Sequence, residues 1–376
     1  MDSVTLTPAA SAVFAAVLTR GPLSRTEVSR MTGLSSAAVT KAVRPILAAG
    51  YLDELPVGRA VPGSGRPAAP LAVRAEREFS AGVRVTAGEL VTVVTDLRAR
   101  VRGTRRVRPA GTGPAAVAAA IAEALAALRQ TLPPVRRLGV AVPGEVDKAP
   151  GVVRRWPSQG WRDVPLAALV RAATGLPVTV ENDVKALTVT EQWFGEGVGT
   201  RSFALVTVGA RVGCGLVVNG ALVEGGYGVA GEIGHVPVDG AGPPCACGGR
   251  GCVEAIAAEH AIAARRGVDF PEALALAAEG DRAAREAFAA AGRAVGRGIA
   301  AMVNMFGPEK VVVAGEAVPG LLAEHIRAAY GPQAFGAAGG CPLVTRPLPA
   351  HAWARGAAAV TITDLVNRPW TARGRA

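Results

Sequence analysis

Three of the five cysteines in this chain fall within eight residues, in the segment PPCACGGRGCVEA at positions 243–255. They are Cys245, Cys247 and Cys252, and nine residues separate His235 from the first of them. One imidazole and three thiolates make a closed tetrahedral set that holds structural zinc and leaves no position open for water. Soft thiolates favour zinc over magnesium or calcium, and the intervening glycines let the chain fold back around one point. The spacing therefore predicts a structural zinc site.

The same cysteines could instead be free thiols beside a core histidine. A redox pair fits less well, because such pairs usually have the form Cys-x-x-Cys. Five cysteines with three of them clustered do not resemble a secreted disulfide framework and fit a reducing cytoplasm. The N-terminal residues lack the basic and apolar regions of a signal peptide. No run of about 18 uncharged apolar residues occurs, so no membrane span is predicted, and we expect a cytoplasmic protein.

The first 75 residues carry three short helical patterns. The second begins at Ser24, which forms a Ser-x-x-Glu capping box with Glu27. The third follows the short turn MTGLSS, and a glycine in so short a turn is typical of a helix-turn-helix. The segments YLDEL and APLAV then read as the two strands of a wing. Residues 1–75 are therefore predicted to form a winged helix-turn-helix domain.

In such a domain the third helix enters the major groove of double-stranded DNA. The residues expected on its polar side are Ser35, Ser36, Thr40, Lys41 and Arg44. Arg59 and Arg66 of the wing loop are placed to reach phosphates or a narrow minor groove. Eight basic against four acidic residues give this segment a net charge of 8 − 4 = +4. The alternative is a three-helix domain used for protein contacts. A general arginine bias would also account for the charge of +11 on the whole chain.

The rest of the chain, residues 76–376, contains two β-meanders, each followed by helices. This repetition predicts two related α/β lobes with a ligand cleft between them. Lobe one is expected at about 76–185 together with the C-terminal helix at about 352–370, and lobe two at about 186–351 with the zinc loop. Six arginines between positions 98 and 108 resemble a nucleic-acid patch, although a solvated strand face explains them better.

GVAGEIGHVPVD followed by CACGGRGCVEA resembles the ROK family of sugar kinases and sugar-responsive repressors. Further segments occur in the family's order, among them VAVPGEVD, LPVTVENDVKAL and GIAAMVNMFGPEKVVVAG. The helix-turn-helix and the segment GSGRPAAPL are similar to the repressor branch. The resemblance implies an actin-like, ribonuclease-H-like pair of lobes that assembles as a homodimer or homotetramer. A two-fold dimer would read a palindromic operator.

The resemblance also implies a sugar pocket, and five residues of this chain match its motifs. They are Asn182, Asp183, Glu232, His235 and Glu254. Asp183 matches the catalytic base of the family's kinases, but here it is expected to act as a sugar ligand, so no catalytic residue is assigned. Charged groups around a polyol give strong, directional hydrogen bonds. The zinc loop is expected to hold His235 and Glu254 in place.

The phosphate-binding loops depart from the kinase pattern. Arg84-Val85-Thr86-Ala87-Gly88 replaces an Asp-x-Gly-Gly-Thr turn, and Gly209-Ala210-Arg211 replaces Gly-Thr-Gly. Because phosphoryl transfer depends on positioning and electrostatic stabilisation, these losses predict that ATP-dependent catalysis is absent. We expect a sugar-responsive transcriptional regulator, a repressor of carbohydrate genes. Alternatives are a sugar kinase with an appended DNA-binding domain, a DNA-binding protein with a vestigial pocket, and an anion site at Arg84 and Arg211.

Overall fold

The computed structural model describes residues 3–4, 7–56, 69–226, 228–367 and 370–371. The chain divides into two compact units, unit 1 (Met1–Phe194 with Trp353–Ala376) and unit 2 (Gly195–Ala352). The DNA-binding head expected at residues 1–75 therefore belongs to unit 1, and the finer domain boundaries stay a prediction. None of the helices described in these ranges is long and apolar enough to cross a membrane.

The head contains three helices, α1 (Pro8–Arg20), α2 (Arg25–Thr32) and α3 (Ser36–Ala48). The predicted capping box at Ser24 and Glu27 is present, and Gly33 ends α2 in the left-handed conformation. Strand β2 (Leu52–Glu54) pairs antiparallel with β3 (Leu71–Val73), as the wing requires. The wing loop between them, with Arg59 and Arg66, lies outside the described residues.

The head shares its hydrophobic core with the rest of unit 1. Phe14, Val17 and Ile46 of the head are fully buried there together with Ile362 and Val366, which come from the C-terminal helix. Burying apolar side chains from both segments in one cluster stabilises their contact at about 25 cal/mol per Å² of apolar surface. The head and the C-terminal helix are thus one packed body within unit 1.

Unit 1 is built on a five-stranded sheet with the order β11-β7-β4-β5-β6. Its strands are β4 (Phe79–Val85), β5 (Leu90–Thr95), β6 (Val101–Val107), β7 (Val135–Val142) and β11 (Val178–Asn182). Strands β4, β5 and β6 form the expected antiparallel meander, and β7 and β11 continue the sheet in parallel with β4. A separate three-stranded sheet contains β8 (Glu145–Asp147), β9 (Val152–Trp156) and β10 (Trp161–Val164).

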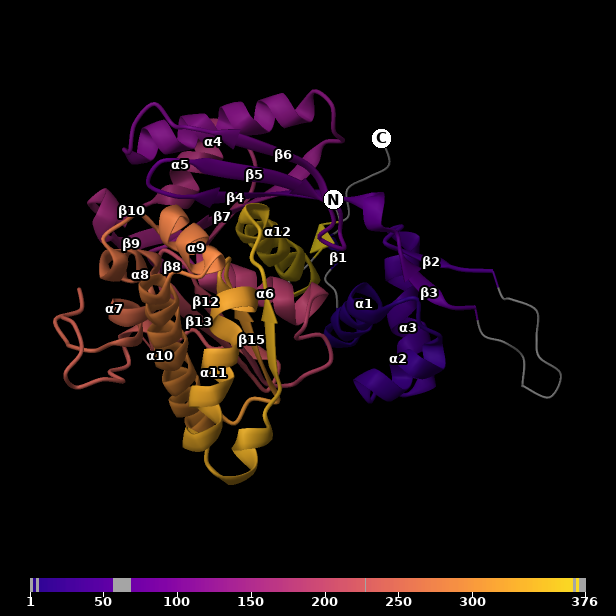
Figure 1. Cartoon of the computed structure of the whole chain (residues 1–376). Coiled ribbons are helices and arrows are strands. Elements are labelled where there is room, and N and C mark those ends of the chain that lie inside the picture. Colours follow the sequence, from indigo (N-terminus) through magenta and orange to yellow (C-terminus); the bar gives the residue numbers. More distant parts are fainter. Residues whose placement is uncertain (1–2, 5–6, 57–68, 227, 368–369, 372–376) are drawn as a thin grey trace. The chain divides into compact units, whose positions relative to one another are not determined.

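Helices cover both faces of this sheet. Helices α4 (Pro114–Arg129) and α5 (Leu166–Thr174) share one core with its strands, and α12 (Ala350–Asn367) lies against the other face (Figure 1). Two strand glycines allow α12 to approach closely. A Cβ added at Gly82 would lie 2.0 Å from the carbonyl oxygen of Ala354, and one at Gly139 would lie 1.9 Å from that of Ala357.

Three arginines of β6 and the turn before it have structural partners. Arg102 pairs with the fully buried Asp96 and with Glu76, and Arg106 pairs with Glu89. Arg98 donates a hydrogen bond to the carbonyl oxygen of Gly21. These contacts support the solvated strand face over a nucleic-acid patch.

Unit 2 repeats the sheet order of unit 1 as β14-β13-β12-β15-β16. Its strands are β12 (Phe203–Val208), β13 (Val212–Val218), β14 (Ala221–Leu222), β15 (Lys310–Ala314) and β16 (Leu343–Arg346). Its helices are α7 (Val253–Ala257), α8 (Glu259–Arg266), α9 (Phe270–Glu279), α10 (Arg282–Phe306) and α11 (Ala323–Tyr330). Gly292 and Gly296 of α10 lie against the backbone of α11. The meander-then-helix repetition expected from the sequence is therefore confirmed.

We predict that Gly139→Ala destabilises the protein, because the added methyl group meets the backbone of α12, which cannot move without disturbing the sheet. Overpacking of this kind costs about 1–3 kcal/mol, measurable as a lower free energy of unfolding in denaturant. Gly88→Ala is the matched control, since nothing lies within 4 Å of its added Cβ. Equal stability of the two variants would contradict the close packing of α12.

Candidate functional site

The structure gathers the predicted metal ligands at one point of unit 2. Donor atoms of His235, Cys245 and Cys247 all lie within 4.8 Å of one another. The Cys245 Sγ lies 3.5 Å from His235 Nδ1, and Cys247 Sγ lies 3.8 Å from Cys252 Sγ. A tetrahedral zinc ion, with bonds of about 2.3 Å to sulfur and about 2.0 Å to nitrogen, would set its ligands about 3.5–3.8 Å apart. The donor set and its spacing therefore fit a tetrahedral metal ion.

A short hairpin brings these residues together. Pro237 bridges to Cys252 and Pro244 to Arg250, and the Cys245 amide donates to the carbonyl oxygen of Gly249. Gly251 has φ 60°, and a Cβ there would lie 1.6 Å from a backbone oxygen of the facing strand. Only glycine fits at that position, so the glycines between the cysteines serve to close the loop.

The thiols of Cys247 and Cys252 differ in acidity. A hydrogen bond from the backbone of Gly249 lowers the pKa of Cys247, whereas burial raises the pKa of Cys252 to about 12. Cys252 is therefore a neutral thiol at pH 7 unless a cation takes the place of its proton, as a bound metal does. A metal ion bound here would therefore displace the proton of Cys252 and coordinate its sulfur together with the neighbouring donor atoms.

Two other predicted sugar ligands lie beside this hairpin. Glu254 is the second residue of α7, two positions after Cys252. It is buried and accepts a hydrogen bond of 3.0 Å from the Val212 amide. Glu232 is exposed, and its Oε2 lies 3.9 Å from Nε2 of His235, the ring nitrogen opposite the one that faces Cys245. The hairpin consequently fixes the positions of Glu254 and His235 together.

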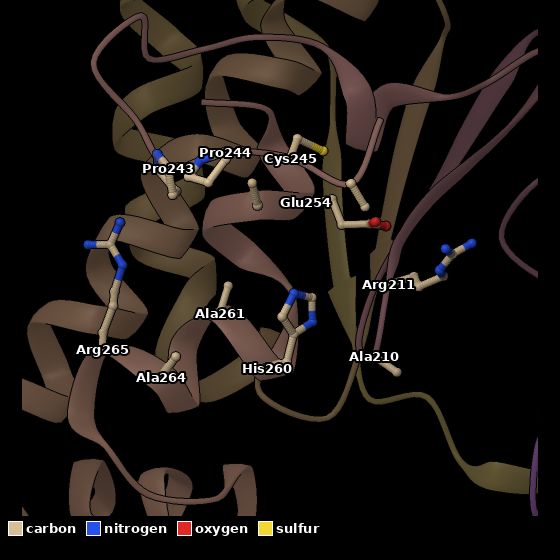
Figure 2. A pocket seen from close by; sticks show the side chains of 12 residues that line it. Ala210, Arg211, Pro243, Pro244, Cys245, Glu254, His260, Ala261, Ala264 and Arg265 are labelled. Atoms are coloured by element: carbon tan, nitrogen blue, oxygen red, sulfur yellow. The ribbon is translucent and has the colours of Figure 1, made fainter. Parts of the chain in front are cut away.

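Glu254 lines a cavity of about 620 Å³ in unit 2 (Figure 2). The β12–β13 turn, the cysteine hairpin, α7 and α8 form its walls. Its basic lining residues are Arg211, His260 and Arg265, and Figure 2 shows Arg211 and Arg265 on opposite sides of it. The cavity offers one buried carboxylate among several hydrogen-bond donors, an arrangement suited to a small polar molecule.

Asn182 ends strand β11, and its side chain caps the helix that follows. Its Oδ1 accepts hydrogen bonds from the amides of Val184 and Lys185, and its Nδ2 donates to the carbonyl oxygen of Gly144. These bonds satisfy donors at the start of α6 (Asp183–Phe194). Asn182 therefore holds Asp183 at the first position of α6, and much of its own hydrogen-bonding capacity is used within the chain.

Asp183 forms a nearly buried ion pair with Arg84. The Arg84 Nη2 lies 3.2 Å from the Asp183 Oδ2, and the two side chains are 24% and 5% exposed. The Arg84 guanidinium also stacks 4.0 Å above the ring of Trp353, a cation–π contact. Arg84 of β4 thus engages Asp183, the residue that the family resemblance matches to the kinase base.

The family resemblance matches two turns, at residues 84–88 and 209–211, to phosphate-binding loops. Hydrogen bonds within the protein close both turns. In the first, the Thr86 hydroxyl donates to the Glu89 carbonyl oxygen and accepts from the Glu89 amide. In the second, the Gly209 amide donates to the carbonyl oxygen of Arg211, and the Glu259 amide donates to that of Gly209. The Thr86 hydroxyl and the Gly209 amide are therefore already engaged within the protein.

The predicted DNA-contacting residues of α3 are all exposed. Ser35 caps the helix by accepting from the Ala38 amide, and the Thr40 hydroxyl donates to the Ser36 carbonyl oxygen. Lys41 and Arg44 lie one turn further along, opposite the buried Val39 and Val43. The helix therefore presents one polar, positively charged face.

The predicted sugar ligands fall into two groups. Asn182 and Asp183 belong to unit 1, whereas Glu232, His235 and Glu254 belong to unit 2. Their shared role in one pocket stays a prediction. Sequence reasoning missed the Arg84–Asp183 pair and Trp353. The change from an acid to a base at position 84 was a usable signal for the pair, but nothing in the sequence marked Trp353.

Comparison with known proteins matches residues 80–364 to the model of the ROK family. The DNA-binding transcriptional repressor Mlc of Escherichia coli (strain K12) is 29% identical over 324 residues, which cover 81% of this chain and 80% of that protein.

Two solved structures share the fold. A ROK family transcriptional regulator, a homologue of the E. coli Mlc protein, superposes with a TM-score of 0.80 at 26% identity and covers 95% of both chains. A ROK family glucokinase from Streptomyces griseus, in complex with glucose and AMPPNP, has a TM-score of 0.66 at 27% identity and covers 75% of this chain and 98% of its own. The expected fold class, a helix-turn-helix before a ROK domain, is thereby confirmed.

Proposed function

The chain belongs to the ROK family, and we propose that it is a sugar-responsive, DNA-binding transcriptional regulator without kinase activity. Its similarity to Mlc and to a ROK regulator over most of the chain, head included, supports a regulatory role. The observation that carries the proposal is the Arg84–Asp183 ion pair. It occupies the carboxylate that a kinase of this family needs as a base, and it puts a cation where the kinases carry an acid.

The proposed effector is a sugar or sugar derivative, and the carboxylates of Asp183 and Glu254 are proposed to accept hydrogen bonds from its hydroxyl groups. Both carboxylates are buried, where Asp183 pairs with Arg84 and Glu254 accepts a hydrogen bond from the Val212 amide. Hydrogen bonds from hydroxyl groups to such charged acceptors contribute about 1.5–3 kcal/mol each.

We predict that the protein binds at least one sugar in a panel of D-glucose, D-xylose, N-acetyl-D-glucosamine and their 6- or 5-phosphates, as measured by isothermal titration calorimetry. Glu254→Gln should weaken that binding by a factor of about 10 or more, because a neutral acceptor replaces a charged one. Glu279→Gln, an exposed change at the end of α9, is the matched control and should leave affinity unchanged.

The likeness to a glucokinase supports a second candidate, a sugar kinase with an appended DNA-binding head. An ATP-turnover assay with the sugars that bind distinguishes the two functions. A coupled assay with each bound sugar should show no sugar-dependent ATP turnover. Turnover that Asp183→Asn abolishes would establish the kinase and refute the proposal. If no sugar in the panel binds while DNA binding is intact, the pocket is vestigial.

The DNA partner is proposed to contact the polar face of α3, in double-stranded operator sites that a dimer would read as a palindrome. We predict that Arg44→Ala weakens binding to a duplex selected from a random library, and that the logarithm of affinity falls steeply with the logarithm of salt concentration. Loss of one phosphate contact reduces that slope by about 0.9. Arg105→Ala, an exposed arginine of β6, serves as control in fluorescence anisotropy, and equal losses for the two variants would contradict the assignment to α3.

We also propose that His235, Cys245, Cys247 and Cys252 hold one structural zinc ion per chain. Elemental analysis should find it, and Cys252→Ser should remove most of it. A loss of about 2 kcal/mol would lower the melting temperature by about 4–8 °C in a domain of this size. Cys341→Ser is the control, because Cys341 lies outside the proposed ligand set and its thiol donates to the Pro308 carbonyl oxygen, which a serine hydroxyl can also do. Metal-free protein of unchanged stability would refute the site.

A further inference from the structure

The Arg84–Asp183–Trp353 cluster lies where three elements of unit 1 meet. Arg84 comes from β4, Asp183 is the first residue of α6, and Trp353 lies in the first turn of α12. The guanidinium pairs with the carboxylate on one side and stacks on the indole on the other. Arg84 is thus the single residue of this cluster that touches the beginning of both helices.

Both helices run from this cluster into the core of the DNA-binding head. The last two residues of α6, Trp193 and Phe194, pack against that core. In α12, Ile362, Leu365 and Val366 are buried in the same core. At 1.5 Å per residue, the two helices span about 17 Å and about 20 Å between these points. Two rigid elements therefore join one cluster to one head.

The two helices are also locked to each other and to the sheet. A Cβ added at Gly356 of α12 would lie 2.9 Å from the backbone of Ala186 and Leu187 in α6. Gly82 and Gly139 allow equally close contact between α12 and the sheet. Because backbone meets backbone at these points, side-chain rearrangement cannot absorb a displacement of either helix. A shift at one end must reach the other.

A second contact ties α12 to the head through the turn between β5 and β6. Arg355, two residues after Trp353, donates from Nε to the Ala99 carbonyl oxygen at 2.8 Å. The neighbouring Arg98 donates to the Gly21 carbonyl oxygen, at the end of α1, at 3.0 Å. The fully buried Asp96 holds this turn by accepting from the amides of Arg98 and Arg100. The turn thus links the start of α12 directly to the head.

We propose that Arg84 is the positioning residue through which occupation of Asp183 is transmitted to the DNA-binding head. The inference rests on the proposed function, in which a sugar binds Asp183. Sugar hydroxyls that donate to the Asp183 carboxylate compete with Arg84 for it. The Arg84 Nε is buried and has no hydrogen-bond partner, an unfavourable state for a polar group. A weakened ion pair therefore releases the guanidinium, changes its stack on Trp353 and shifts α6 and α12.

The test is hydrogen–deuterium exchange of the full chain, because contiguity alone does not establish coupling. Without ligand, Arg84→Ala should raise amide exchange in the head helices α1–α3 about tenfold relative to α4, which lies on the opposite face of the same sheet. Arg106→Ala, which removes an exposed ion pair of that sheet, is the matched control and should leave the ratio unchanged. Equal increases in head and α4, or none in the head, would overturn the proposal.

A second arm uses whichever of D-glucose, D-xylose or N-acetyl-D-glucosamine binds. In the wild type the sugar should alter exchange in the head, and in Arg84→Ala that effect should vanish while calorimetry still detects binding. A head effect that persists in the variant would overturn the proposal. If no sugar binds, the proposed function fails. The exchange measured without ligand in Arg84→Ala then still tests whether Arg84 is coupled to the head. Should Arg84→Ala not fold, Trp353→Leu, which removes only the stack, replaces it in both arms.

Discussion

The buried ion pair between Arg84 and Asp183 is the interaction on which the rest of unit 1 depends. Removing one partner of such a pair typically costs about 3–5 kcal/mol, because the other charge is left buried and uncompensated. The pair therefore fixes the start of α6 against β4, and its stack on Trp353 fixes α12 in the same place. One arginine thus contacts both a predicted sugar ligand and the first turn of α12.

In unit 2, the cysteine hairpin positions the buried carboxylate of Glu254. The cysteine hairpin places donor atoms of His235, Cys245 and Cys247 within 4.8 Å of one another, with Cys252 Sγ 3.8 Å from Cys247 Sγ. The chain leaves the hairpin directly into α7, whose first turn carries Glu254. The metal-ligand geometry and the position of this carboxylate are therefore set by one short segment. The sheet orders of the two units are alike, yet unit 1 orients its carboxylate by an ion pair and a helix cap, and unit 2 by a hairpin.

The features that the sequence predicts well are those that depend on near neighbours. The spacing of His235 and the cysteines, the capping box at Ser24 and the paired meanders all follow from local patterns, and the structure has each of them. The contact between Arg84 and Asp183 joins residues 99 positions apart, and no local pattern encodes it. Asn182 is predicted to contact sugar, and that prediction stays open; the structure adds that its side chain caps α6 at the junction with β11, a role that only the course of the backbone reveals.

The central claim is that sugar binding and DNA binding are thermodynamically linked in one chain that does not use ATP. It is tested most directly by measuring the dissociation constant for a selected DNA duplex with and without a saturating concentration of the sugar that calorimetry identifies, at one fixed salt concentration. The account predicts a change of about 5–150-fold, the usual range of coupling between two sites. An unchanged DNA affinity in the presence of demonstrably bound sugar would contradict it.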